Sequence, residues 1–189
     1  MMTSAKTNIK AKKMMLLIGM VSMTMTFAGL TSAYVVSSSR SDWLVSFEMP
    51  FVFTISTFIL ILSSVTLSLA KHFNSKDSSN KSLIFVFLTI LLAFTFIFYQ
   101  FKGFSQIIDS GYYFTGAQSS ITTSFIYVLV LLHMLHLIAG ILVLFIISFN
   151  LLKGKYSSEN ALGIELGVIF WHFLDFLWCY LYLFVVLYK

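Results

Sequence analysis

The chain has 189 residues, of which 59% are hydrophobic and 10% charged, and its mean hydropathy is +0.93. A water-soluble domain of this length could not bury so much apolar surface, so the composition excludes that class and indicates a membrane protein. The net charge of +5 is typical of lysines on the cytoplasmic side of such a protein and does not indicate nucleic-acid binding. Because the apolar runs are continuous and do not alternate, they favour spanning helices over a barrel.

The first 39 residues combine a basic tail with a long charge-free run. The tail carries Lys6, Lys10, Lys12 and Lys13, and no charge follows from Met14 to Ser39. A secretory signal is one alternative, since residues 31–33 (Thr-Ser-Ala) resemble a weak cleavage site, but the run exceeds the roughly 7–15 apolar residues of an ordinary signal. We therefore predict that residues 14–36 form the first spanning helix. Small residues form a stripe on it that suits close packing by another helix: Ser22, Thr26, Gly29 and Ala33.

Two further helices are predicted over residues 51–70 and 83–101, separated by a polar loop over 71–82. Hydroxyl groups line two sides of the first of these helices: Thr57, Ser64 and Ser68 on one side, Ser56 and Ser63 on another. Such hydroxyl groups usually bond between helices, and a path for protons or water is the alternative. Residues 102–121 show little helical pattern and are expected to be a longer connection.

The last two helices are predicted over residues 122–149 and 163–188, with a loop between them. The fourth is about 42 Å long at 1.5 Å per residue, enough to span a bilayer with some tilt. We find neither a repeat nor a low-complexity linker, so we expect a single transmembrane domain over 1–189. The sequence therefore predicts an all-α membrane protein built as a bundle of five helices.

The distribution of basic residues predicts how this bundle is oriented. With the N-terminus in the cytoplasm, nine of the twelve Lys and Arg residues fall inside, leaving Arg40, Lys102 and Lys189 outside. The positive-inside rule then favours a cytoplasmic N-terminus and a periplasmic C-terminus.

Five ionisable residues within or next to the last two spans form the candidate site: His133, His136, Glu165, His172 and Asp175. An ionised Asp at the centre of a spanning helix costs about 2.5–3.5 kcal/mol on insertion scales, so Asp175 should face the bundle and not lipid. We predict that at least one of the three histidines lies within hydrogen-bond distance of its carboxyl group.

Three interpretations of these residues remain open from the residues themselves. They could form hydrogen bonds within the bundle, they could bind haem or another metal, or they could carry protons. Two His residues at i and i+3 share a side of a helix, but this spacing alone is a weak signal, and the second ligand set of a di-metal bundle is absent from the sequence.

Several motifs resemble haem-copper oxidase subunit III. Residues 170–178 (Phe-Trp-His-Phe-Leu-Asp-Phe-Leu-Trp) are similar to the motif of its last helix, and 124–140 to its Phe-Tyr…His-Gly-x-His…Gly helix. Gln100 stands where the family often has a Gln, residues 56–66 resemble an Asn-Thr…Ser-Ser-x-Thr helix, and 27–34 resemble a Phe-Ala-Gly-Leu…Ala-Tyr run. The motif residues with a packing role would be Trp171, Trp178, Gly140, Ser63 and Ser64.

The resemblance implies a five-helix bacterial form in the inner membrane, without a catalytic, haem, copper or other metal site on this chain. It implies a subunit that packs on subunit I beside the other oxidase subunits, in some cases within a respiratory supercomplex, that holds phospholipid, and that supports proton uptake. The oxidase would be a cytochrome c oxidase, with a quinol oxidase or nitric-oxide-reductase component, or an independent haem-binding cytochrome, as alternatives. Two departures are Met23, where the family often has Glu, and Met134, where it usually has Gly.

Overall fold

A computed structural model describes residues 2–41, 43–44, 49–116, 119–156 and 161–188, and all named regular elements in these ranges are helices. They are α1 (Met2–Ser37), α2 (Phe51–Ser75), α3 (Ser79–Asp109), α4 (Ile121–Leu152) and α5 (Leu162–Leu187). Each of the five has the length and apolar composition to cross a membrane, α1 over Ile9–Ser37. The predicted all-α membrane bundle of five spans is thus confirmed.

The helices run beyond the predicted spans at several ends. Helix α2 continues five residues past Ala70, and α3 begins at Ser79 and ends at Asp109, so most of the expected 71–82 loop and the first part of the 102–121 connection are helical. Asp77, with a φ of 53°, makes the tight turn that remains between α2 and α3. The boundaries differ because hydropathy marks only the part of a helix that lies in hydrocarbon, whereas helical hydrogen bonding continues at little cost into the polar interface.

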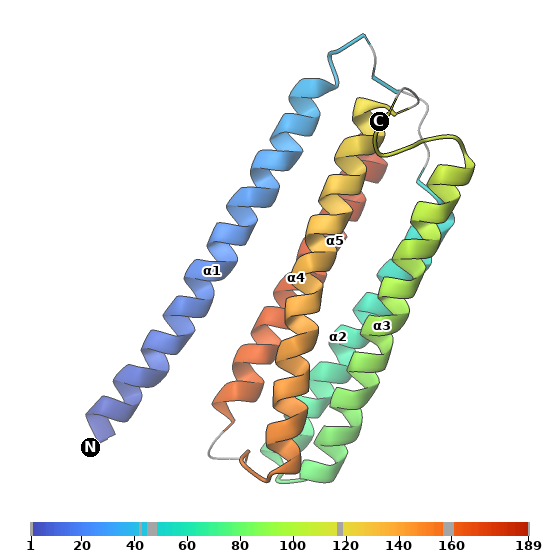
Figure 1. The fold of residues 1–189 in the computed structure, drawn as a ribbon. Coiled ribbons are helices and arrows are strands. Elements are labelled where there is room, and N and C mark those ends of the chain that lie inside the picture. Colours follow the sequence, from blue (N-terminus) through green and yellow to red (C-terminus); the bar gives the residue numbers. More distant parts are fainter. Residues whose placement is uncertain (1, 42, 45–48, 117–118, 157–160, 189) are drawn as a thin grey trace.

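Neighbouring helices alternate in direction. Figure 1 shows the N-terminus at the same end of the bundle as the α2–α3 and α4–α5 connections, and the C-terminus at the opposite end. Helices α2 and α3 pack closely along their length, and α5 packs against α1, α2 and α4. The two Trp side chains of α5, both about 1% exposed, lie in the core between these helices.

Helix α1 is the least buried of the five. Only 11% of the residues in its apolar window are buried, compared with 50% for α5, and among the described residues it packs on α4 and α5 alone. Its inward face is formed by Phe27, Thr31 and Tyr34, and Thr31 shares a hydrogen bond with Tyr180 of α5. The predicted small-residue stripe of α1 is exposed within this chain.

Candidate functional site

Polar side chains meet along the line where α2 contacts α5, which we call the α2–α5 seam. Its members are Thr57, Ser63, Ser64 and Ser68 of α2 with Trp171, His172, Asp175 and Trp178 of α5. The two helices are antiparallel, so a residue further along α5 meets a residue earlier in α2. Trp171 meets Ser63, whereas Trp178, two turns later, meets Thr57. The hydroxyl residues singled out from the sequence therefore lie opposite the aromatic and ionisable residues of α5.

Two tryptophans attach α5 to α2 through their ring N–H groups. Trp171 Nε1 donates to Ser63 Oγ at 3.0 Å, and Trp178 Nε1 donates to Thr57 Oγ1 at 2.9 Å. Each hydroxyl donates its own proton to a carbonyl of α2, from Ser63 to Leu60 and from Thr57 to Phe53. Both indole N–H groups and both hydroxyl groups are therefore satisfied inside the bundle, as buried polar groups need to be.

His172 joins the same two helices. Its Nδ1 is hydrogen-bonded to Ser64 Oγ, and its Nε2 lies 3.1 Å from Ser68 Oγ. Ser68 is exposed at the outer side of the seam, whereas Ser64 and His172 are half-buried. The imidazole thus connects the interior of the seam with its outer edge.

Asp175 lies inside the bundle, 5% exposed, as the cost of a lipid-facing carboxylate predicts. The prediction that a histidine bonds to this carboxyl group is wrong, because among the described residues no protein hydrogen bond of normal geometry reaches either oxygen of Asp175. The Ser64 hydroxyl lies beside this carboxyl group, but it is already bonded to His172. Helical spacing correctly placed Asp175 and His172 near one another without indicating that a serine would stand between them.

The two histidines of α4 point to different helices. His133 is fully buried, with its ring 5.1 Å from Trp178 of α5 and 6.2 Å from Phe96 of α3, and neither ring nitrogen has a hydrogen-bond partner within the part of the chain that the structure describes. His136 bonds through Nδ1 to Leu132 O at 2.7 Å, and its ring lies 5.7 Å from Phe27 of α1. Across the described residues, no three His, Cys, Asp or Glu side chains are grouped so as to hold a metal ion.

Glu165 lies apart from the other four ionisable residues of the predicted site. Its carboxylate accepts a hydrogen bond from Lys13 Nζ at 3.0 Å and so joins the N-terminal part of α1 to the start of α5. Both side chains are partly exposed, so this ion pair contributes at most about 1 kcal/mol. Of the five predicted ionisable residues, two therefore lie together in the α2–α5 seam, His172 and Asp175, and the other three lie elsewhere.

Gly140 allows α4 and α5 to approach closely. A Cβ atom at this position would lie 2.9 Å from Leu174 Cδ1 and 3.2 Å from two ring atoms of Trp171. The ring of Trp171 thus uses space that a larger residue of α4 would occupy, while its N–H group bonds to α2.

A link between α2 and α3 was not predicted. Gln100 Nε2 donates to Ser56 Oγ at 3.0 Å, and both side chains are fully buried. The signal available in the sequence was the amide at the end of a long apolar run, a group that needs a partner inside a bundle.

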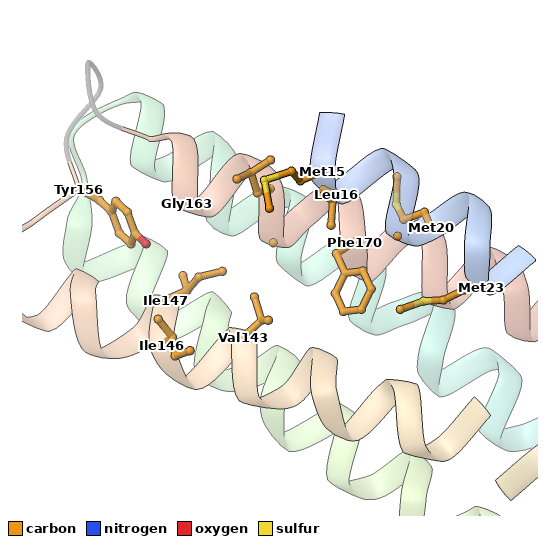
Figure 2. A pocket seen from close by; sticks show the side chains of 13 residues that line it. Met15, Leu16, Met20, Met23, Val143, Ile146, Ile147, Tyr156, Gly163 and Phe170 are labelled. Atoms are coloured by element: carbon orange, nitrogen blue, oxygen red, sulfur yellow. The ribbon is translucent and has the colours of Figure 1, made fainter. Parts of the chain in front are cut away.

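An apolar groove of about 460 Å³ separates α1 from α4 and α5 near the N-terminal end of the bundle. Figure 2 shows Met20 and Met23 of α1, Phe170 of α5 and Ile147 of α4 lining it. Met23, noted in the sequence as a departure from the pattern that the resemblance implies, lines this groove with its thioether.

The sequence matches the family described as cytochrome c oxidase subunit III over residues 5–189. It is 31% identical to cytochrome c oxidase subunit 3 of Chondrus crispus over 144 residues, which cover 75% of this chain and 48% of the relative. It is also 31% identical to cytochrome bo(3) ubiquinol oxidase subunit 3 of Pseudomonas aeruginosa (70% of this chain, 61% of the relative). A probable quinol oxidase subunit 3 of Staphylococcus saprophyticus is 28% identical (72% and 66%). The matched part thus spans about half to two thirds of these relatives.

Proposed function

The chain belongs to the cytochrome c oxidase subunit III family, and from this premise we propose that it is a non-catalytic subunit of a respiratory haem-copper oxidase. The observation that carries the proposal is the family match, which extends over all five helices. Its relatives include subunits of cytochrome c oxidases and of quinol oxidases. We propose that the partner subunits of this chain reduce oxygen, whichever of the two electron donors they use. This chain would support that reaction without binding the electron donor.

The positions of the histidines support a role without redox metals. His172 uses both ring nitrogens within the α2–α5 seam, and His136 bonds to its own helix. Among the described residues, His133 faces the rings of Trp178 and Phe96, not a second histidine with which it could clamp a haem. Haem and copper would accordingly be held by the other subunits of the complex.

The exposure of α1 supports a role in assembly. Its stripe of small residues, Ser22, Thr26, Gly29 and Ala33, is exposed within the chain, and small residues let helices in membranes approach closely. We infer that this stripe packs against a larger subunit, which in this family would be subunit I. The apolar groove between α1, α4 and α5 suits a phospholipid acyl chain, because its walls are formed almost entirely by hydrocarbon and methionine side chains.

The proposed location is a bacterial inner membrane, with the N-terminus in the cytoplasm and the C-terminus in the periplasm. The basic residues of the α2–α3 turn and of the α4–α5 connection lie at the same end of the bundle as the basic N-terminal segment. This grouping supports the positive-inside orientation, since lysines next to spans concentrate on the cytoplasmic side. Support of proton uptake during turnover belongs to the same proposal.

The proposal is tested by deleting the chain and comparing the purified oxidase with enzyme from cells in which the chain is restored. We expect the haem and copper spectrum per mole of subunit I to be unchanged. Oxygen consumption should begin near normal and decay faster during turnover, or the yield of assembled enzyme should fall. Assays with reduced cytochrome c and with a quinol identify the electron donor.

The opposite result would be loss of a haem or copper signal in proportion to the chain removed, while subunit I remains folded. That result would assign a cofactor to this chain and overturn the supporting role. Failure of any oxidase subunit to co-purify with the full chain would overturn the proposal as well.

A further inference from the structure

We propose that Asp175 is a proton-binding site, neutral at physiological pH, which exchanges its proton with the N-terminal end of the bundle through Ser64, His172 and Ser68. The family match does not assign this role, and the proposal stands apart from the supporting function above. It follows from the direction of the hydrogen bonds in the α2–α5 seam.

The outermost hydroxyl fixes the direction of the whole chain of bonds. Ser68 Oγ donates its proton to the backbone carbonyl of Ser64 at 3.0 Å, so toward His172 it can only accept. The Nε2 atom of His172 must therefore carry the proton and donate to Ser68. A neutral imidazole has one donor and one acceptor nitrogen, which makes Nδ1 the acceptor. Ser64 then donates its hydroxyl proton to Nδ1.

Once Ser64 has donated to His172, its oxygen offers only lone pairs to Asp175. An ionised carboxylate has no proton to share with those lone pairs, whereas a protonated carboxyl group can donate to them. Asp175 is 5% exposed, and within the described residues neither of its oxygens has a protein partner of normal geometry. Since burying an unpaired charge is far more costly than burying a neutral group, the neutral form is the one that fits.

The charged and titratable groups around Asp175 do not offer an ion pair. The titratable and charged residues considered as partners of Asp175 lie on α5 itself and on the helices packed against it. They are His172, Cys179 and Glu165 on α5, Lys71 on α2, His133 and His136 on α4, and Lys13 on α1. Lys13 forms an ion pair with Glu165. The charge of Lys71 interacts with His172 at the outer edge of the seam. No salt bridge to Asp175 is formed among the described residues.

The bonds of His172 with Ser64 and with Ser68, together with the carboxyl group of Asp175 beside Ser64, give a path for the proton. As Asp175 releases its proton to Ser64 Oγ, the hydroxyl proton of Ser64 passes to His172 Nδ1, and a transient imidazolium forms. The imidazolium then releases its Nε2 proton on the side of Ser68. In the reverse direction, a proton taken up at Nε2 leads to transfer from Nδ1 to Ser64 and from Ser64 to Asp175, which restores the neutral carboxyl group. Ser68 is exposed and lies seven residues before the end of α2, which is about 10 Å along the helix axis.

Infrared difference spectroscopy on the full chain, purified with the subunits that accompany it, tests the proposal. The spectrum of wild type minus Asp175→Asn at neutral pH should contain the carbonyl band of a protonated carboxylic acid, and this band should shift in D₂O. The Asn side chain can donate to Ser64 as the neutral acid does, so the thermal stability of Asp175→Asn should remain close to that of the wild type. Glu165→Gln is the matched control: its carboxylate is paired with Lys13, so its difference spectrum should lack the carbonyl band of a protonated carboxylic acid.

The path is tested separately by the rate at which the Asp175 band shifts after transfer to D₂O. Replacement His172→Phe should leave the band in place, because the carboxyl group stays buried, and should slow its shift severalfold, because the link to Ser68 is lost. Carboxylate bands in the Asp175 difference spectrum would overturn the proton-binding site. A band whose shift is equally fast in His172→Phe and in the wild type would overturn the path. Neither outcome bears on whether the chain assembles with an oxidase.

Discussion

At the scale of single residues, two tryptophan side chains of the α2–α5 seam bridge the helices through one hydrogen bond each. Trp171 bonds to Ser63, and Trp178 bonds to Thr57, while the rings fill the core. In a membrane, hydrogen bonds between helices contribute about 0.6 kcal/mol on average and up to about 1.7 kcal/mol. These bonds therefore determine which surfaces meet more than they determine the total stability.

A double-mutant cycle measures the contribution of one of these bonds. We expect Trp171→Phe and Ser63→Ala to show a coupling free energy of about 0.6–1.7 kcal/mol in detergent unfolding, because each change removes the same bond. The control cycle combines Trp171→Phe with Ser56→Ala, whose hydroxyl bonds to Gln100 on the other side of α2. Equal coupling in the two cycles would contradict the assigned bond.

At the scale of elements, α4 and α5 pack closely where α4 has a glycine. We predict that Gly140→Ala destabilises the bundle by about 1–3 kcal/mol, the usual cost of inserting a methyl group into a packed core. The added Cβ would lie within 2.9 Å of Leu174 and 3.2 Å of the Trp171 ring, and both side chains are buried.

The matched control for this change is Gly29→Ala on α1. Among the described residues, no atom beyond the chain neighbours and the local helix backbone lies within 4 Å of a Cβ built at Gly29, so within the isolated chain this substitution should be neutral or slightly stabilising. Thermal unfolding of the two variants in the same detergent makes the comparison. A loss of stability in Gly29→Ala equal to that in Gly140→Ala would contradict the packing described here. A defect of Gly29→Ala seen only in the assembled complex would instead indicate that a partner helix covers the stripe.

At the scale of the whole molecule, the alternating helices place two sets of connections at opposite ends of the bundle. We predict that Ser78 lies on the cytoplasmic side and Ser110 on the periplasmic side. Single cysteines at these positions, in a Cys179→Ser background, should differ in reaction with a membrane-impermeant thiol reagent added outside intact cells. Residue 110 should react and residue 78 should not, because nine of the twelve basic residues belong to the Ser78 side. Labelling of residue 78 from outside would contradict the orientation.

Much of this architecture could be predicted from the sequence, because the bilayer imposes simple rules. Continuous apolar runs such as 122–149 must become helices, since lipid offers no partner for backbone N–H and C=O groups. The same rule places an unpaired Asp175 inside the bundle, and the motif at residues 170–178 indicated the family that the comparisons confirm. The extent of a single domain over 1–189 and the orientation in the membrane stay predictions.

The partners of the polar side chains were decided by the tertiary structure alone. Spacing along α4 places His133 and His136 on one side of the helix, yet the rotation of α4 between its neighbours turns one ring to α3 and α5 and the other to α1. Likewise, Asp175 and His172 share a helix, but the register of α2 inserts Ser64 beside both. A sequence pattern determines the face on which a side chain lies, whereas its partner depends on the rotation and sliding of a second helix, which are set by packing along the whole interface.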